Sequence, residues 1–588
     1  MCGITGYIGN NKHAIKVLLT GLKNLEYRGY DSAGIAYLEG DNLKIVKSIG
    51  PIKSLEEKID YSIESTLGIG HTRWATHGRP SEENSHPHHV DSITIVHNGI
   101  IENYIELKNE LLEHNYTFKS ETDTEVACAL LDYLYNEKNN FIETIKEFQN
   151  RVRGSYAILA HIKGDNDTLY AIRNKSPLII GVGIGENFVA SDVPAILEYT
   201  NKYIVLDDGD YATITKDGIN LYDKDGNKKN YEIRVFSGDA SVIDKKGYEH
   251  FMLKEIHEEP EIVKGLIKKY IENNELDKLP DLKDYENIYI VACGSAMHAG
   301  LIGKYLIEKN LNIPVTVEYA SEFRYKRLFL NDKSLVIAIS QSGETADTLA
   351  AVNIAKENKS HTIGIVNVKE SSIARACDEV IYTEAGSEIA VATTKAYIAQ
   401  VVILTLLSLK NNKDLKEITS KLPIYMDTLI NNDTYDKIVK NIITREDIFF
   451  IGRLTDYAIC MEGSLKLKEI SYIHSEAYAA GELKHGTISL ISEGTPVFAV
   501  ITDESIAEKT ISNSKETKAR GANVILITTD KLDIDSDFYN DKIVIPDVED
   551  FTPILAIIPL QLISYKIALL RGCSIDKPKN LAKSVTVE

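Results

Sequence analysis

The sequence predicts an α+β sandwich at the amino-terminal end, followed by two related α/β doubly wound domains. Three observations predict this order. Residues 2–239 hold short β-type runs with turns and helices between them. After about residue 284, apolar strands alternate with helices, as in a parallel sheet with helical crossovers. The strand sequences of this second half then recur at a spacing of about 160 residues, which is the size of a domain.

In the first part, four apolar runs indicate strands and three stretches indicate helices. Strands are expected at 4–9, 93–99, 155–162 and 170–175, and helices at 14–25, 103–113 and 124–135. Thr122, followed three residues later by Glu125, is typical of a capping box at the start of the third helix.

In the second half, three pairs of matching strands define the repeat. NIYIVACG at 287–294 matches DIFFIGRL at 447–454, LVIAISQS matches PVFAVITD, and TIGIVNV matches NVILITT. The expected domains are therefore 2–239, a charged helical linker at 240–283, the two repeats at 284–425 and 426–578, and a tail at 579–588.

Composition excludes several classes of protein. The chain has 588 residues and a net charge of -20, which would repel nucleic acid and anionic membranes. Its six cysteines lie far apart without a CxxC pair or a secretory segment, so we expect a reduced, cytoplasmic protein. The apolar stretch at 552–570 contains Pro553, Pro559 and Lys566 and is expected to be a buried helix, not a membrane span.

Cys2 is the strongest candidate nucleophile. Removal of Met1 would leave a residue with a thiol and a free α-amine, and that amine titrates at about 7.7–8.0. An unprotonated amine is able to take the thiol proton, so a single residue supplies nucleophile and base. Taken alone, a cysteine in the second position is more commonly the ordinary start of a strand.

Polar residues at the ends of nearby strands suit the binding of an amino acid. Asn98 and the N–H of Gly99 would form an oxyanion hole. Arg73 is a partner for a carboxylate, and Asp123 is a partner for an ammonium group. The run His86-Pro87-His88-His89 lacks carboxylate or cysteine ligands at metal-binding spacing, so it favours a structural loop and no metal site.

The segment Ser340-Gln341-Ser342-Gly343-Glu344-Thr345 follows an apolar strand and precedes a helix. Such a turn directs backbone N–H groups and hydroxyls at an anion, although a serine-rich helix cap is the alternative. The matching place in the second repeat, 501–505, carries carboxylates that would repel phosphate. The sequence therefore predicts one phosphate loop, in the first repeat, with the strand end at 292–295 in the same crevice and Cys293 in the core.

Groups suited to proton transfer occur late in the chain. Glu462, Lys466 and Glu469 share one face of a helix, and His485 lies between glycines. Lys583, in the terminal segment, is able to form a Schiff base with a carbonyl. The alternatives are a surface salt-bridge ladder for the first three residues and a surface lysine for Lys583.

Five motifs together resemble the class II glutamine amidotransferases, which have the N-terminal-nucleophile (Ntn) hydrolase fold. They are Cys2–Ile4, EYRGYDS at 26–32, HTRWATHG at 71–78, HNG at 97–99 and SETD at 120–123. The second half resembles two sugar isomerase (SIS) domains, and the chain as a whole is similar to amidotransferases that act on fructose 6-phosphate.

That resemblance implies a role for each matching residue. It implies that Cys2 attacks glutamine, that ammonia passes through an internal channel gated by Trp74, and that fructose 6-phosphate becomes glucosamine 6-phosphate, the first step toward UDP-N-acetylglucosamine. The implied glutamine-site residues are Cys2, Arg73, Thr76, His77, Asn98, Gly99 and Asp123. The implied sugar-site residues are Ser295, Ser340, Gln341, Ser342, Thr345, Thr393, Lys466, Glu469, His485 and Lys583. Two positions depart from the family pattern, Ala296 and Thr487, and Ala296 cannot donate a hydroxyl to phosphate.

The resemblance further implies a homodimer formed through the SIS half, no cofactor and no metal. Two other functions remain open from the sequence. One is an SIS enzyme that removes nitrogen from an amino sugar or fructosamine phosphate, which would need no glutaminase. The other is a sugar-phosphate sensor, in which Lys583, His485 and Glu469 would be idle.

Overall fold

The structure is a computed structural model that describes residues 2–75, 77–236, 244–410, 412, 414–535 and 537–585. The chain divides into two compact units, Met1–Ile243 with Ala582–Glu588, and Asp244–Leu581. The two units are described separately below.

The first unit contains two antiparallel sheets. The eight-stranded sheet has the order β15 (Arg234–Val235), β11 (Lys202–Val205), β9 (Ile179–Val182), β10 (Glu186–Ala190), β1 (Gly3–Gly9), β4 (Leu67–Arg73), β2 (Ser32–Glu39) and β3 (Asn42–Ile49). The seven-stranded sheet has the order β14 (Lys228–Lys229), β13 (Ile219–Tyr222), β12 (Tyr211–Ile214), β8 (Leu169–Asn174), β7 (Gly154–Ile162), β6 (Ile93–Ile101) and β5 (His88–Val90).

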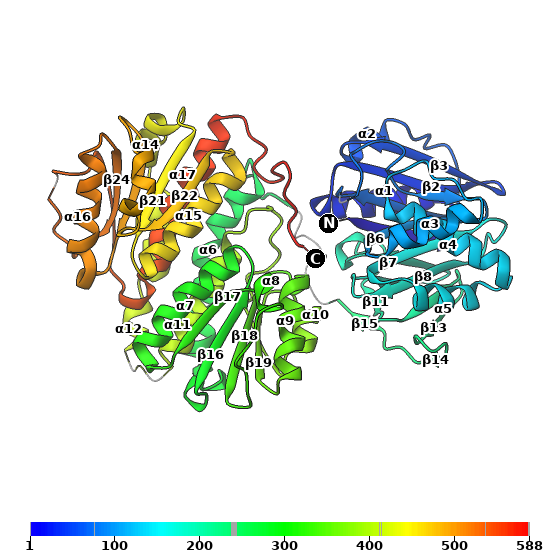
Figure 1. The fold of residues 1–588 in the computed structure, drawn as a ribbon, viewed down its shortest axis with the longest axis horizontal. Coiled ribbons are helices and arrows are strands. Elements are labelled where there is room, and N and C mark those ends of the chain that lie inside the picture. The colour runs from blue at the N-terminus through cyan, green and yellow to red at the C-terminus, as the bar shows by residue number, and fades with distance from the viewer. Residues whose placement is uncertain are drawn as a thin grey trace. The chain divides into compact units, whose positions relative to one another are not determined.

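The two sheets pack face to face, and helices cover both outer faces (Figure 1). The core between the sheets contains Ile4, Ile69, Val96 and Leu159, all fully buried. The helices on the two outer faces are α1 (Ala14–Leu25) and α2 (Ile52–Glu56) on one, and α3 (Tyr104–Glu113), α4 (Asp123–Lys138) and α5 (Phe141–Arg151) on the other. The predicted α+β sandwich is confirmed.

The start of α4 differs in one detail from the capping box that the sequence predicts. Thr122 is the N-cap, and its hydroxyl accepts a hydrogen bond from the N–H of Glu125, as expected. The Glu125 carboxylate does not return to Thr122. It accepts instead from the N–H groups of Lys119 and Ser120, because the preceding loop folds over the helix end.

The second unit holds two five-stranded parallel sheets with equivalent strand orders (Figure 1). The first is β17 (Val315–Tyr319), β16 (Asn287–Ala292), β18 (Ser334–Ser340), β19 (His361–Val366) and β20 (Glu379–Tyr382). The second is β22 (His474–Ala479), β21 (Asp447–Gly452), β23 (Pro496–Ile501), β24 (Asn523–Thr529) and β25 (Asp541–Ile545). Each strand pair that the repeat predicts occupies the same place in its sheet, so the duplicated doubly wound fold is confirmed.

Helices lie on both faces of each sheet, and the inner helices form a shared core. The longer helices are α6 (Phe251–Ile267), α7 (Ser295–Leu311), α9 (Ala346–Glu357), α11 (Lys395–Ser408), α15 (Thr455–Ser471), α16 (Ala507–Lys518) and α17 (Thr552–Leu570). The shorter ones are α8 (Ala320–Phe323), α10 (Ser372–Ala376), α12 (Leu415–Thr419), α13 (Leu422–Ile430) and α14 (Tyr435–Ile442).

The helix α17 is the expected buried helix. Within the described residues, the segment Glu549–Leu570 is the one helix long and apolar enough to cross a membrane, and 83% of its most apolar window is buried inside the protein. It packs against α13, α14 and α15, so its apolar surface belongs to the core.

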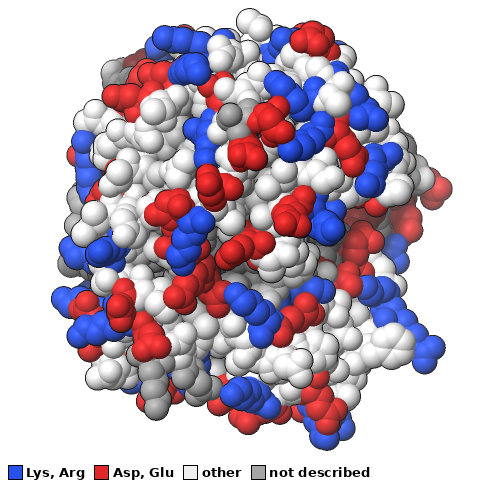
Figure 2. Space-filling model, turned by 90° about the vertical axis from the view of Figure 1, so that its left-hand side faces the viewer, with Lys and Arg blue, Asp and Glu red and all other residues white. Residues whose placement is uncertain are grey.

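The charged stretch that the sequence indicates as a linker contains α6, which packs into the second unit. Met252, Ile256 and Val263 are fully buried in the shared core. The buried Glu255 of this helix accepts a hydrogen bond from the N–H of Ile389 at 2.5 Å. On the face of the molecule drawn in Figure 2, acidic and basic side chains are interspersed among the described residues.

The backbone conformation of Leu454 predicts that replacing this leucine with glycine stabilises the protein. Its backbone has φ 52° and ψ -122°, nearly the φ 56° and ψ -133° of Gly294 at the matching strand end of the first repeat. A leucine in this conformation is strained, whereas glycine is not. We expect Leu454→Gly to raise the free energy of unfolding by about 1 kcal/mol, measured by thermal unfolding of the full chain. Gly294→Ala should lower it, and a Leu454→Gly variant of lower stability would contradict the strain.

The burial of Glu259, in α6, predicts that the stability of the protein depends on pH. The side chain is fully buried, and burial raises its pKa well above 4.5. The folded state therefore holds a proton that the unfolded state loses above pH 4.5, so this group lowers stability progressively as pH rises above that value. We expect Glu259→Gln to increase stability at pH 7 by about 1–3 kcal/mol and to flatten the pH dependence. The matched control is Glu261→Gln on the exposed side of the helix; equal effects of the two variants would contradict the prediction.

Candidate active sites

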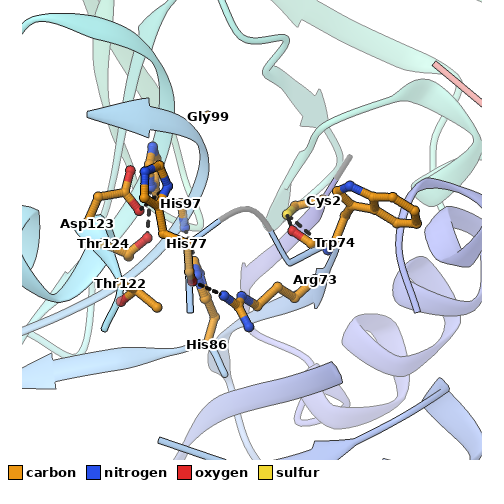
Figure 3. Close-up of a pocket in the computed structure, with 10 residues that line it drawn as sticks. All are labelled: Cys2, Arg73, Trp74, His77, His86, His97, Gly99, Thr122, Asp123 and Thr124. Carbon is orange, nitrogen blue, oxygen red and sulfur yellow. Dashed lines mark hydrogen bonds and ion pairs between the residues drawn. The ribbon is translucent and has the colours of Figure 1, made fainter. Parts of the chain in front are cut away.

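Five of the seven residues expected to bind glutamine, all but Thr76 and Asn98, line one cavity of the first unit. Figure 3 shows ten side chains around it, with Cys2 and Trp74 on one side and Asp123 and His97 on the other. The lining residues are Cys2, Arg73, Trp74, His77, His86, His97, Gly99, Thr122, Asp123 and Thr124. Strands β1, β4 and β6 and the start of α4 bring them together.

Cys2 precedes β1, which lies in the middle of the eight-stranded sheet between β10 and β4. Its Sγ accepts a hydrogen bond from the Trp74 N–H at 3.2 Å, and the thiol lies 3.4 Å from the Trp74 carbonyl oxygen. Burial raises the pKa of the thiol, while the Trp74 N–H and the Arg73 guanidinium act in the opposite direction. A nearby base is therefore needed to produce the thiolate at neutral pH.

Asn98 and Gly99 belong to β6 of the seven-stranded sheet, on the side that faces Cys2. The Asn98 Nδ2 donates to the Cys2 carbonyl oxygen at 3.1 Å, which places its amide next to the nucleophile. Gly99 has φ 123°, and a Cβ there would lie 1.9 Å from the Ser155 carbonyl oxygen. Only glycine fits this position, so the local turn that presents Asn98 depends on it.

Charged groups in the cavity match the two ends of an amino acid. The Arg73 Nη2 donates to the backbone oxygens of His77 and Gly78, whereas its Nη1 is buried without a hydrogen-bond partner among the described residues. Asp123 is 3% exposed, and its Oδ2 accepts from the Ile101 N–H at 2.8 Å. One donor of Arg73 thus remains for a bound ligand, and the other oxygen of Asp123, Oδ1, lies 4.0 Å from His77 Nδ1. Thr76 lies outside the described residues.

Trp74 is held at the cavity wall by its neighbours. Its ring meets the Tyr30 ring edge to face at 6.1 Å, and the N–H of the following Ala75 donates to Asp31 Oδ2 at 2.8 Å. Tyr30 and Asp31 belong to the EYRGYDS motif, so this motif supports the tryptophan and the strand end that carries Arg73.

Sequence reasoning missed several groups around this cavity. His86, His97, Thr122 and Thr124 line it, and Ser191 contacts Asn98 from behind. Burial lowers the pKa of His86 well below its usual value and also lowers that of His97, so both are neutral at pH 7. The HTRWATHG motif and the histidine run lie near these groups in sequence, but no pattern marks Ser191, because only tertiary pairing of β1 with β10 brings it here.

In the second unit, the predicted phosphate loop connects β18 to α9. Gly343 has φ 67°, and a Cβ there would lie 1.9 Å from Ser371 Oγ. The Ser340 Oγ accepts from the Gly343 N–H at 3.0 Å and lies 2.9 Å from Thr345 Oγ1. These bonds hold the loop in a tight turn with its hydroxyls at the carboxyl end of the sheet, where α/β folds bind ligands. Gln341 and Ser342 lie in the same turn.

At the equivalent strand end of the second repeat, after β23, the carboxylate of Asp456 binds the backbone. Asp456 is 1% exposed and accepts hydrogen bonds from both the N–H and the hydroxyl of Thr502, the N–H at 2.9 Å. Burial raises the pKa of Asp456 to about 7. The Thr502 N–H, at the position that matches Gln341 of the first repeat, is thus already paired within the second repeat.

The helix α15 carries a buried charge network that reaches the first repeat. The Lys466 Nζ lies 2.6 Å from Glu469 Oε2, 3.4 Å from Glu462 Oε1 and 3.1 Å from Ser295 Oγ. Glu462 also lies 2.8 Å from His298 Nδ1. Lys466 and Glu462 are each 1% exposed, so these groups form no surface ladder. Burial opposes the charge on Lys466, but the two glutamates outweigh it and raise its pKa.

The remaining predicted sugar-site residues occupy separate places. Thr393 donates a hydrogen bond to Glu388 in the loop before α11. His485 is exposed in the 3-10 turn Leu483–His485. Lys583 is half-buried and lies in the segment Ala582–Glu588, which groups with the first unit. Ala296 is 9% exposed at the start of α7, one residue after Ser295.

Family models match both halves of the chain. Residues 71–198 match the glutamine amidotransferase domain, and residues 281–410 and 441–571 each match the SIS domain. The class of protein defined by fold and sites is therefore a glutamine amidotransferase joined to two sugar isomerase domains.

Full-length relatives narrow the class. The chain is 49% identical to glutamine--fructose-6-phosphate aminotransferase [isomerizing] of Caldanaerobacter subterraneus subsp. tengcongensis and 48% identical to that of Clostridium tetani, with 100% of both chains covered in each case. The C-terminal domain of glucosamine-fructose-6-phosphate aminotransferase from Francisella tularensis is 38% identical, has a TM-score of 0.52, and covers 57% of this chain and 100% of that one. The chain belongs to the glutamine--fructose-6-phosphate aminotransferase [isomerizing] family of enzymes.

The network on α15 predicts a large effect of removing its lysine. In Lys466→Met, two neighbouring carboxylates would lose their buried cation, and breaking such a pair costs about 3–5 kcal/mol. We expect the free energy of unfolding of the full chain to fall by this amount, measured by urea denaturation. The control is Lys468→Met, an exposed lysine on the same helix; a loss of the same size in the control would contradict the role of the buried charge.

Proposed function

We propose that this enzyme forms glucosamine 6-phosphate and glutamate from fructose 6-phosphate and glutamine, with the two reactions in separate sites. The observation that carries the proposal is the coexistence in one chain of a cavity lined by Cys2, Arg73 and Asp123 and a duplicated sugar isomerase fold with a hydroxyl-rich turn after β18.

In the glutaminase half, the unprotonated α-amine of Cys2, exposed once Met1 is removed, takes the thiol proton. The thiolate attacks the glutamine carboxamide, and the oxyanion is held by Asn98 and Gly99. Arg73, Thr76, His77 and Asp123 hold the amino acid. Ammonia leaves with one proton from the amine, and water then hydrolyses the Cys2 thioester to glutamate.

The released ammonia must reach the sugar without protonation in bulk water, because ammonium has no lone pair for attack. We propose that it travels through an enclosed channel with Trp74 as gate. The support is the position of Trp74 in the cavity wall, where its own backbone contacts the Cys2 thiol.

In the isomerase half, Ser295, Ser340, Gln341, Ser342, Thr345 and Thr393 would bind the sugar phosphate. His485 opens the sugar ring, and Lys583 holds the open-chain ketose as an imine. Lys466 assists while Glu469 moves a proton between C1 and C2, which converts the ketose into an aldose amine. The contact of Lys466 with both Glu469 and Ser295 supports this assignment, since it joins a proton-transfer carboxylate to the phosphate side.

We further propose a homodimer through the SIS half and a cytoplasmic location, as the family resemblance implies. The amino-sugar deaminase alternative is disfavoured, because such a reaction has no use for a glutamine cavity with Cys2. A sensor without activity is disfavoured by the buried Lys466 network, which is costly to maintain without a function.

Cys2→Ala separates the two half-reactions. We expect glutamine-dependent formation of glucosamine 6-phosphate to fall by about 10³-fold or more, because the nucleophile is lost, while formation from added ammonia continues. Mass spectrometry of glutamate and hexosamine phosphate measures both.

The matched control is Cys377→Ala, a half-buried cysteine of the second unit. Unchanged glutamine-dependent output in Cys2→Ala would refute the assigned nucleophile, and glutamate without hexosamine phosphate from the unsubstituted enzyme would refute the synthase function.

A further inference from the structure

The Asn98 side-chain amide is held at both ends by hydrogen-bond partners, and two of these, His71 and Ser191, have no role in the proposed chemistry. Its Nδ2 lies 2.8 Å from Ser191 Oγ and 3.1 Å from the Cys2 carbonyl oxygen, and its Oδ1 lies 3.1 Å from His71 Nε2. His71, Asn98 and Ser191 are 0%, 6% and 2% exposed. The amide is thus buried with a partner for each polar atom.

The contacts of His71 determine which way the amide points. His71 Nε2 also lies 2.9 Å from the His97 carbonyl oxygen, which can only accept. The hydrogen of the imidazole must therefore be on Nε2, and this N–H can pair only with an oxygen of the Asn98 amide. The amide nitrogen is consequently directed toward Cys2 and Ser191.

The surroundings keep His71 in this single form. Its Nδ1 is buried without a hydrogen-bond partner among the described residues, so a second proton there would be unsatisfied. Burial lowers the pKa of His71 to about 3, with His97 and Arg73 adding to the effect. The ring stacks on His86 at 3.9 Å and 11°, which fixes its plane.

Ser191 ties the amide to the strand that carries the nucleophile. Its N–H donates to the Ile4 carbonyl oxygen at 3.1 Å, and its Oγ accepts from the Ile4 N–H at 2.7 Å. Arg28 Nη1 donates to the Ser191 carbonyl oxygen at 3.1 Å. Ser191 is therefore bonded to β1 at Ile4, which lies two residues after Cys2. Its hydroxyl oxygen also accepts a hydrogen bond from the Asn98 amide of the opposite sheet.

We propose that His71 and Ser191 are positioning residues that clamp the Asn98 amide with its N–H donors toward Cys2, so that the oxyanion hole is formed before glutamine binds. The proposal rests on the proposed glutaminase function. During attack, the N–H that now donates to the Cys2 carbonyl oxygen is the donor available to the oxyanion, and the amide keeps its orientation. A rotated amide would direct its own oxygen at the developing negative charge and raise the barrier.

The test is a double-mutant cycle on glutamine hydrolysis by the full chain. Asn98→Ala should lower kcat by about 10²–10³-fold, and Ser191→Ala by about 3- to 10-fold, the worth of one hydrogen bond. Both should leave KM for glutamine unchanged, because the oxyanion exists only after binding. In the Asn98→Ala background, Ser191→Ala should have no further effect on kcat.

A second readout separates positioning from general weakening of the fold. The γ-aldehyde of glutamate adds the Cys2 thiol and forms a tetrahedral oxyanion, whereas glutamate itself does not. Ser191→Ala should weaken inhibition by the aldehyde about 3- to 10-fold and leave inhibition by glutamate unchanged. His71→Phe keeps a ring for stacking on His86 but removes the N–H. It should likewise weaken inhibition by the aldehyde and leave inhibition by glutamate unchanged. If that variant does not fold, the Ser191 cycle decides alone.

The matched control is Ser65→Ala, a buried serine of the same unit whose hydroxyl donates to the Leu67 carbonyl oxygen. A kcat loss in Ser191→Ala that persists in the Asn98→Ala background, or one that Ser65→Ala reproduces, would overturn the clamp. Unchanged kcat in Ser191→Ala, with glutamine hydrolysis intact, would overturn it too. Absence of glutamine hydrolysis in the unsubstituted enzyme, or full activity of Asn98→Ala, would instead overturn the proposed function on which the clamp rests.

Discussion

The central position of β1 in the eight-stranded sheet is the constraint on which the glutaminase site depends. A chain terminus ordinarily frays, but here the first strand is paired on both sides, by β10 and β4. The backbone next to Cys2 is therefore as rigid as the core. Because β4 ends at Arg73 and β10 leads directly to Ser191, the same two pairings also bring the carboxylate partner and the Asn98 support to the nucleophile.

In the second unit, a duplicated fold carries two chemically different strand-to-helix turns. Both repeats retain the strand-to-helix turn after the first strand, including its left-handed residue, Gly294 in one and Leu454 in the other. The difference is chemical. Asp456 pairs internally with Thr502 in the second repeat, whereas the first repeat has a hydroxyl-rich turn at Ser340–Thr345, which is the phosphate loop in the proposed function. The second repeat contributes instead the buried network of α15, which reaches Ser295 of the first.

Several features were predictable from the sequence because they depend on local physics. The pattern of apolar residues predicted α1 at 14–25, and the long apolar stretch at 552–570 predicted α17, both with their observed bounds; the second pair of sheets followed from the strand repeat. Helix spacing placed Glu462, Lys466 and Glu469 on one face. It could not decide between a surface ladder and a buried cluster, since burial depends on what packs above that face. The observed packing of α15 against α7 and α17 decided it.

The sequence by itself determined the two fold classes and the duplication, and it predicted Cys2 as the nucleophile, because turn residues, periodicity and motif spacing act over a few residues. Only the tertiary structure decided which groups hold the Asn98 amide, that Lys466 is buried between two carboxylates, and that Asp456 pairs with Thr502 in the second repeat. These arrangements join residues tens to hundreds of positions apart, and hydrogen bonds and desolvation depend on distance in space, which no local pattern encodes.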